Sequence, residues 1–305
     1  MDKFVKGRVA DARISATSLI FTLFGDTVSQ HSGSIWLSSI IDAMALFGIN
    51  ERLVRTSIYR LVKDGLLESE RIGRCSYYRF SDNGKHHAAR AAERIYATTE
   101  PESGKVWTLA MVSQRHDSEK LVELRRGLNW LGFIQLKPGL YGHPAGDLKA
   151  LKQMLSEYKL TDMVVLFNAS PSDAHSQNAL KDVVYDKWDL DEVALHYRDF
   201  CKVYRPFIKQ VRSKKLSSRD SFMLRTMLIH EYRRVLLKDP QLPETMLPVK
   251  WEGFVAHAIS KQLYTEIGVR AEGFIREEFQ NALGYLPKSA TRFKKRFGGL
   301  RENQG

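Results

Sequence analysis

Cysteine is scarce in this sequence of 305 residues, which contains only Cys75 and Cys201. Two cysteines cannot form the disulfide framework of a small secreted protein. Neither stands with histidines or another cysteine at the spacing of a zinc site. This scarcity fits a reducing compartment, so we expect a cytoplasmic protein with no bound metal and no cofactor.

Long apolar runs are absent as well. No stretch approaches 18 apolar residues without charge, so we expect no membrane span and no membrane partner. The first eight residues, Met-Asp-Lys-Phe-Val-Lys-Gly-Arg, lack the apolar core and the cleavage site of a signal peptide. The length is sufficient for two or three domains with cores of their own.

The common catalytic motifs are also missing. There is no glycine-rich phosphate loop ending in Lys-Ser or Lys-Thr, and no Gly-x-Ser-x-Gly. His230-Glu231 is not followed by a histidine at zinc-protease spacing, and neither cysteine has a basic context that marks it as a nucleophile. We therefore expect no catalytic residues and a protein that is not an enzyme.

Positive charge is abundant and unevenly distributed. The formal net charge is +12, and residues 202–238 hold 11 Lys and Arg against 2 Asp and Glu. Such a segment can attract a polyanion, which is either DNA or a phosphorylated ligand. The alternative is that these charges only keep the protein in solution.

The segment Asn50–Asp64 predicts a helix with two unlike faces. Asn50 suits the N-cap, and Gly65 suits the residue after the C-cap. The inner face is expected to hold Leu53, Val54, Ser57, Ile58, Leu61 and Val62. The outer face holds side chains that can donate to phosphates and base edges, namely Arg52, Arg55, Thr56, Tyr59, Arg60 and Lys63.

The flanking segments place this helix in a recognisable order. Ser34–Phe47 predicts an amphipathic helix, and only three residues separate it from the basic helix, as in a helix-turn-helix. Leu66–Arg71 and Arg74–Phe80 predict two strands around a turn at Ile72-Gly73, with Arg71 and Arg74 at the tip. We interpret this order as a winged helix that binds DNA. The alternative is an ordinary helical pair whose charges are solvated.

The middle of the chain predicts a separate module. Ser15–Val28 and Lys85–Ala97 are expected to be helical, and Thr98–Lys105 has the composition of a linker. After it, strands and helices alternate in the order βαββαβ, which predicts a ferredoxin-like domain. Its strands are expected at 106–112, 133–136, 140–141 and 163–167, and its helices at 118–131 and 146–158. Ala169–Lys181 is expected to be a polar loop.

The last third predicts helices at 190–211, 218–238, 253–265 and 270–282. The helix 218–238 is apolar on most sides, so we expect it to be buried. Thr226, His230, Arg233 and Arg234 nevertheless fall on one stripe of it. Buried charges need partners, so these residues either pair with Glu231 or Asp239 or form the wall of an anion-binding pocket.

Several motifs resemble the PaaX family, which comprises repressors of bacterial phenylacetic acid degradation operons. The similar segments are Ser18–Thr27, Gly48–Thr56, Arg71–Tyr78, His230–Arg234 and Leu237–Pro243. The resemblance extends from about residue 18 to Gly299. Cys75 departs from it, because the resemblance implies an arginine at this position, and we expect this departure to weaken a contact between the wing and phosphate.

The resemblance implies a homodimer that binds operator DNA and is released by phenylacetyl-coenzyme A. It implies that the ferredoxin-like domain is similar to small nucleases of CRISPR adaptation and serves to dimerise. A metal-dependent nucleic-acid-processing enzyme built on that domain is the alternative function. Such a nuclease needs an acidic residue at the end of its first strand, where this chain has Ser113-Gln-Arg-His116, with Asp117 later.

Together these observations predict an α+β protein with three domains. Residues 15–97 would form an N-terminal winged helix-turn-helix, residues 105–181 a central ferredoxin-like domain, and residues 189–299 a C-terminal helical domain that contributes to the inducer site. The expected DNA-binding residues are Arg52, Arg55, Thr56, Tyr59, Arg60, Lys63, Arg71 and Arg74. The expected ligand-binding residues are His230, Arg233, Arg234, Arg205 and Lys209.

Overall fold

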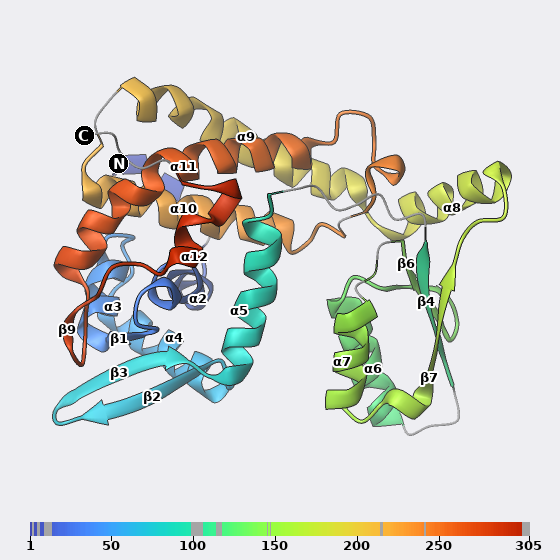
Figure 1. The fold of residues 1–305 in the computed structure, drawn as a ribbon, viewed down its shortest axis with the longest axis horizontal. Helices are drawn as coiled ribbons and strands as arrows, with labels where there is room; N and C mark the ends of the chain where they lie inside the picture. Colours follow the sequence, from blue (N-terminus) through green and yellow to red (C-terminus); the bar gives the residue numbers. More distant parts are fainter. Residues whose placement is uncertain are drawn as a thin grey trace. The chain divides into compact units, whose positions relative to one another are not determined.

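A computed structural model of the chain divides into two compact units, which we describe separately (Figure 1). The first unit combines Met1–Thr98, His196–Leu237 and Glu252–Gly305. The second unit combines Thr99–Leu195 and Lys238–Trp251. The residues that the structure describes are 1, 3–4, 7–8, 14–98, 106–113, 118–144, 146, 148–213, 216–240 and 242–300. Residues 99–105 of the predicted linker therefore lie outside the described part, and the three-domain division stays a prediction.

The N-terminal part of the first unit contains helices and a three-stranded antiparallel sheet in the order β1-β3-β2. Its elements are α2 (Ala16–Asp26), η1 (Val28–Gln30), β1 (Ser34–Trp36), α3 (Leu37–Ala45), α4 (Glu51–Lys63), β2 (Leu67–Ile72), β3 (Cys75–Phe80) and α5 (Asp82–Ile95). The predicted helices at 15–28 and 50–64 are confirmed, and the Asn50 side chain accepts from the Leu53 amide at 2.9 Å.

Two predictions in this part were wrong in detail. The predicted helix 34–47 begins only at Leu37, because Ser34–Trp36 pairs with β3, opposite Tyr77–Arg79. The hairpin turn lies one residue later than predicted, since Ile72 pairs with Cys75 and leaves Gly73 and Arg74 as the turn. Gly73 has φ of 60°, a conformation that glycine adopts without steric cost. A strand register depends on partners elsewhere in the sheet, which local periodicity does not reveal.

The core of this part is formed by the inner faces of α2, α3 and α4 together with Leu67 and Phe80 of the hairpin. Val54, Ile58 and Leu61 of α4 are buried in it, as predicted. Leu53 was predicted to be on the same face, but 46% of it is exposed. It lies in the first turn of α4, where no other element covers it closely enough to bury it.

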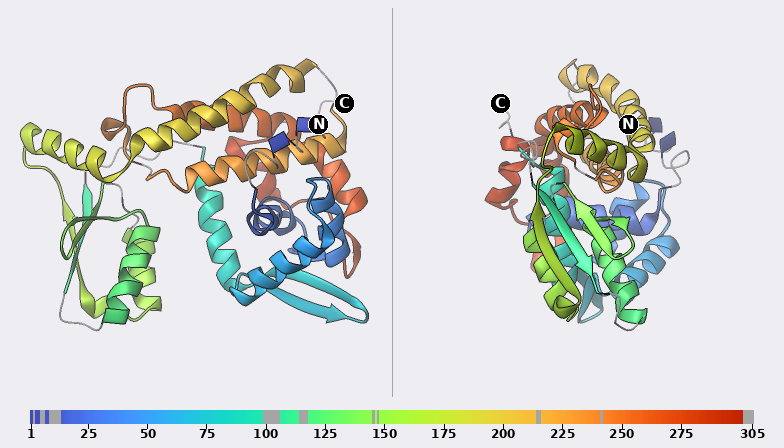
Figure 2. Two further views of the ribbon diagram at one scale, coloured as in Figure 1. Left: turned by 180° about the vertical axis from the view of Figure 1, so that it is seen from behind. Right: turned by 90° about the vertical axis from the view of Figure 1, so that its right-hand side faces the viewer.

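The C-terminal helices complete the first unit (Figure 2). They are α9 (Leu190–Ser213), whose first residues belong to the second unit, α10 (Ser218–Leu236) and α11 (Glu252–Glu278). A short end follows, with β8 (Gln280–Asn281), β9 (Gly284–Tyr285), α12 (Thr291–Lys294) and η4 (Arg296–Gly298). The prediction of separate helices at 253–265 and 270–282 was wrong, because α11 is continuous through Gly268. Packing of α11 on α10 compensates for the roughly 1 kcal/mol cost of a helical glycine.

The second unit contains a four-stranded antiparallel sheet in the order β5-β6-β4-β7. Its elements are β4 (Trp107–Val112), α6 (Ser118–Trp130), β5 (Ile134–Lys137), β6 (Leu140–His143), α7 (Leu148–Glu157), η2 (Thr161–Met163), β7 (Val164–Ala169), α8 (Ala174–Lys187) and η3 (Glu244–Met246). Helices α6 and α7 cover one face of the sheet (Figure 1). Side chains from the covered face of the sheet and from these two helices form a second hydrophobic core.

The predicted polar loop at 169–181 was wrong over most of its length. Helix α8 begins at Ala174, and Asp173 is its N-cap, since a carboxylate oxygen accepts from the Ser176 amide at 2.7 Å. The polar composition of this segment hid the capping signal, which satisfies one of the free amides at a helix start.

Candidate nucleic-acid interface and ligand sites

The outer face of α4 is free of covering protein in the first unit. All six predicted contact residues on this helix, namely Arg52, Arg55, Thr56, Tyr59, Arg60 and Lys63, are exposed, and Tyr59 is 69% exposed. The inner face is fixed by the core. The helix therefore presents a continuous strip of guanidinium, hydroxyl and phenol groups on a rigid support.

Two of these side chains have contacts within the helix. Arg55 donates from Nε to Glu51 Oε1 at 2.8 Å, one turn earlier. Thr56 Oγ1 donates to the Arg52 carbonyl oxygen at 2.9 Å. An exposed i,i+4 ion pair contributes only a few tenths of a kcal/mol. Arg55 can therefore exchange Glu51 for another acceptor at little cost.

The hairpin of β2 and β3 carries the other two predicted contacts. Arg71 and Arg74 are exposed, and Arg71 Nε donates to the Gly73 carbonyl oxygen at 3.3 Å within the turn. Cys75 follows as a free, half-buried cysteine. The tip thus presents two exposed guanidinium groups.

The residues predicted to share one stripe of α10 differ in burial and in contacts in the structure. His230 is fully buried, and its Nδ1 lies 3.1 Å from Thr22 Oγ1. Burial, together with the nearby charges of Arg233 and Arg234, lowers the pKa of His230 to about 3. His230 is therefore neutral at pH 7. Arg234, in contrast, is exposed to solvent.

Arg233 makes contacts inside the protein. Its Nη2 donates to the carbonyl oxygen and to the hydroxyl of Ser18, at 3.1 and 2.7 Å. Its guanidinium lies over the Phe21 ring, 5.3 Å from the centroid. Burial lowers the pKa of Arg233 to about 10, which leaves it charged at pH 7. Glu231, one of the predicted internal partners, pairs instead with Arg8 at 2.6 Å.

Arg205 and Lys209 lie at a different place, in a groove on α9 that we call the α9 groove. Its volume is about 700 Å³, and Glu252 and Val255 of α11 form its other side. Four cations spaced along α9 line it, namely Arg198, Lys202, Arg205 and Lys209. Arg198 pairs with Glu252 at 3.5 Å. Lys214 and Lys215, which belong to the same basic segment of the sequence, lie outside the described residues.

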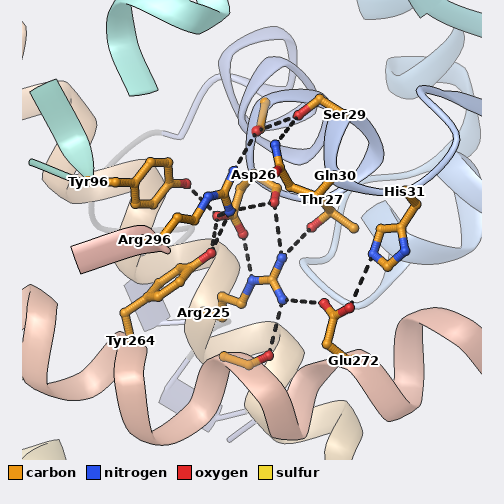
Figure 3. Close-up of polar contacts among 12 residues, drawn as sticks. Asp26, Thr27, Ser29, Gln30, His31, Tyr96, Arg225, Tyr264, Glu272 and Arg296 are labelled. Carbon is orange, nitrogen blue, oxygen red and sulfur yellow. Dashed lines mark hydrogen bonds and ion pairs between the residues drawn. The ribbon is translucent and has the colours of Figure 1, made fainter. Parts of the chain in front are cut away.

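A buried polar cluster that the sequence analysis missed joins α2 to the C-terminal helices (Figure 3). At its centre, Asp26 accepts from Arg225 Nε at 2.7 Å and from Arg296 Nη1 at 2.8 Å. The Tyr96 and Tyr264 hydroxyls donate to the same carboxylate at 2.5 and 2.7 Å. Arg225 is completely buried.

Positively charged neighbours lower the pKa of the two carboxyl groups in this cluster. Burial alone would raise the pKa of Asp26, but the Arg225 and Arg296 guanidinium groups outweigh burial and hold that pKa below its usual value. Arg225 also donates to Glu272 at 2.9 Å, and His31 lies 3.6 Å from the other Glu272 oxygen. Against the effect of burial, His31 and Arg225 lower the pKa of Glu272 to about 2. One signal in the sequence could have revealed the cluster, namely single charges such as Asp26 and Arg225 within apolar helices.

Neither a metal site nor a membrane span is present in the part of the chain that the structure describes. No group of three or more His, Cys, Asp or Glu residues there could hold a metal ion. No helix there is long and apolar enough to cross a membrane. Residues 114–117, where a nuclease would need its acidic residue, lie outside this part.

Comparisons with known proteins give the same family name in three consecutive parts of the chain. Three families match in order: "PaaX-like protein" at residues 15–84, "PaaX protein central Cas2-like domain" at 101–181, and "PaaX-like protein C-terminal domain" at 188–277. The chain is 35% identical over 306 residues to "Transcriptional repressor PaaX" of Escherichia coli (strain K12), covering 100% of this chain and 96% of that protein.

Among solved structures, the chain resembles "Uncharacterized protein Rv0674 from Mycobacterium tuberculosis". The TM-score is 0.50 at 22% identity, with 85% of this chain and 97% of that one covered. This likeness concerns the fold alone.

Proposed function

This chain belongs to the PaaX family, and we propose that it is a cytoplasmic transcriptional repressor rather than an enzyme. The repressor name of its Escherichia coli relative supports this proposal. The observation that carries it is the outer face of α4, where six donors stand exposed on a helix whose other face is fixed in the core.

In this proposal the first unit binds DNA as a winged helix-turn-helix. Helices α3 and α4 and the turn at Gly48, which has φ of 73°, would be the helix-turn-helix. Helix α4 would enter the major groove, where Arg55 and Tyr59 meet base edges. Arg71 and Arg74 at the hairpin tip would contact phosphates, which position the protein without reading sequence directly.

We further propose that phenylacetyl-coenzyme A releases the repressor from the operator of a phenylacetate catabolic operon. Of the five predicted ligand residues, Arg205 and Lys209 share the α9 groove and can meet phosphate groups. The exposed Arg234 remains a candidate, whereas His230 and Arg233 would act from inside the protein through Thr22 and Ser18 of α2. Tenfold derepression requires a difference of about 1.4 kcal/mol in ligand affinity between the two conformations.

The second unit would be a ferredoxin-like module that forms the homodimer. The face of its sheet opposite α6 and α7 carries exposed apolar side chains, including Met111, Val165 and Phe167. Met111 pairs with Val165, and Leu109 pairs with Phe167, so these side chains adjoin one another. A second copy related by a two-fold axis could bury this patch. Phe167→Glu should then shift the sedimentation of the protein from dimer to monomer, and an unchanged dimer would place the interface elsewhere.

Binding to the DNA upstream of the chain's own gene tests the function. In fluorescence anisotropy the protein should bind this DNA far more tightly than a shuffled duplex of equal length. Phenylacetyl-coenzyme A should release it, whereas coenzyme A and acetyl-coenzyme A serve as controls. Equal affinity for the shuffled duplex would contradict sequence-specific repression. Cleavage of either duplex with Mg²⁺ or Mn²⁺ would favour a nuclease.

A further inference from the structure

A second large hollow lies in the first unit, where the hairpin joins α5, and we call it the wing-base cavity. Its volume is about 850 Å³. It is lined by the end of β3, by one face of α5, by the segment between α2 and β1, and by the C-terminal segment around α12. It shares none of its lining residues with the α9 groove.

The rim of this cavity is cationic. Arg79, Lys85, Arg292 and Lys295 are exposed and line it, and they come from two separate parts of the chain. Among the described lining residues, Glu93 is the one carboxylate. This imbalance concentrates positive potential over a concave surface, which attracts anions.

The cations on the rim are available to an incoming anion. Arg79 pairs with Glu68 at 3.2 Å and Lys85 with Asp82 at 2.8 Å, and both pairs are exposed. Exposed ion pairs of this kind contribute little, so a phosphate can replace the carboxylate at small cost. Arg292 differs, because it donates to the Ser29 carbonyl oxygen and thereby anchors α12.

Part of the lining is apolar, and we call this part the floor, whereas Ser29, Gln30, Ser32 and Ser34 make another part polar. Ala88, Ala89 and Ala92 of α5 supply methyl groups, and the rings of Phe80 and Tyr96 border them. Small side chains leave a broad surface on which a flat ring can lie. A cationic rim over an apolar floor suits a ligand that has both phosphate groups and a ring.

We propose that the wing-base cavity binds a small organic phosphate that carries a flat ring, of about the size of a nucleotide. Its volume lies within the range of 300–1,000 Å³ that is typical of small-molecule pockets. An effect of this ligand on DNA binding rests on the proposed function. Binding of the ligand to the cavity does not depend on that function.

The position of the cavity provides a route from such a ligand to the DNA interface. Phe80 ends the hairpin strand and packs on Phe21 and Phe24 of α2, with ring centroids 5.1 and 5.5 Å apart. Tyr96 and Arg296 line the cavity and also hold Asp26 at the end of α2. Because α2 packs on α4, a ligand here contacts both the hairpin and the support of α4.

Calorimetric titration of the full-length protein tests the site, with ADP and inorganic pyrophosphate as probes and no metal present. ADP should bind saturably and more tightly than pyrophosphate, because only ADP has a ring for the floor. Lys85→Ala with Lys295→Ala should weaken ADP binding by about tenfold or more, because it removes two rim cations that would meet the phosphates. The matched control, Lys149→Ala with Lys152→Ala, removes the same charge from exposed lysines of α7 that line neither hollow, and it should leave ADP affinity unchanged.

A second variant tests the cavity apart from its charge. Ala89 is exposed, so Ala89→Trp should fold normally while it fills the floor, and ADP binding should again be lost. Undiminished binding by Ala89→Trp would overturn the proposal, because surface charge alone would then hold ADP. Absence of saturable ADP binding to the wild type, or equal weakening by the α7 control, would overturn it as well.

The consequence for DNA is measured separately, as operator affinity with and without saturating ADP. If ADP weakens operator binding by the wild type but not by Ala89→Trp, this result would support the route through Phe80 and Tyr96. An unchanged operator affinity would overturn this route. Failure of the ligand-free protein to bind its upstream DNA would refute the proposed function, whereas the calorimetric result would still decide the site.

Discussion

Arg225 donates a hydrogen bond from Nε to Asp26 Oδ2 at 2.7 Å, and neither side chain is open to water. The two residues are 199 positions apart, so the bond ties the end of α2 to α10. The C-terminal segment joins them through Arg296. The helix that supports α4 is thereby fixed to the C-terminal part of the first unit.

The first prediction concerns the stability of this pair. Asp26→Asn should lower the free energy of unfolding by about 3–5 kcal/mol, because it leaves two buried guanidinium groups without their shared counter-charge. Urea unfolding followed by circular dichroism measures the change. Asp82→Asn, which removes an exposed carboxylate paired with Lys85, is the control and should leave the free energy of unfolding nearly unchanged. A similar small loss for both variants would show that Asp26 is not a stabilising centre.

The second prediction concerns base contacts on α4. Arg55→Ala and Tyr59→Ala should each weaken operator binding by about 1–3 kcal/mol, which is the value of one good base contact. Both side chains are exposed, so melting temperatures should stay close to the wild type. Lys152→Ala, an exposed cation on α7, serves as the control for loss of charge alone. Wild-type affinity in either α4 variant would remove that residue from the interface.

The third prediction concerns the hairpin tip. Arg74→Ala should weaken operator and random DNA by similar factors, since a phosphate contact carries little sequence information. The slope of log affinity against log salt concentration should fall in magnitude by about one unit. Anisotropy titrations at four salt concentrations measure it. A slope equal to that of the wild type would place Arg74 away from the DNA backbone.

The fourth prediction concerns the pH dependence of stability. The pKa of His230 is about 3 in the folded protein and about 6.5 in the unfolded chain, so the unfolded chain takes up the proton first as pH falls. Stability is therefore lost as pH falls from 6.5 toward 3. The loss should be about 2 kcal/mol between pH 6.5 and 5, at 1.36 kcal/mol per unit. In urea unfolding, His230→Asn should not show this loss of stability between pH 6.5 and 5. The same pH dependence as in the wild type would contradict a lowered pKa of His230.

The fifth prediction separates two neighbouring arginines. Arg233→Gln should lower the free energy of unfolding by about 1–3 kcal/mol, because Ser18 loses a charged partner inside the protein. Arg234→Gln should change it by less than about 0.5 kcal/mol, since Arg234 is exposed. Operator release by phenylacetyl-coenzyme A is then measured for the Arg234 variant. A normal response from this well-folded variant would remove Arg234 from the inducer site.

The sequence by itself determined the local elements around α4. The polar face, the Asn50 cap and the hairpin follow from helical periodicity, capping and β propensity, all of which act between residues close in the chain. Structure that depends on partners distant in the chain did not follow from these local patterns. Strand β1 formed at Ser34–Trp36 because β3 was available to pair with it, and Leu53 stayed exposed because no other element packs closely over it.

Only the tertiary structure decided which charges are internal. The sequence placed His230, Arg233 and Arg234 on one stripe, yet Thr22 and Ser18 contact the first two, and Arg234 faces solvent. Single charges within apolar helices were a signal that Asp26 and Arg225 need partners, but which residues meet was not readable, because the partners are some two hundred residues apart. Desolvation makes an unpaired charge costly inside a protein, and whether a partner is present is a property of the assembled fold rather than of any single segment.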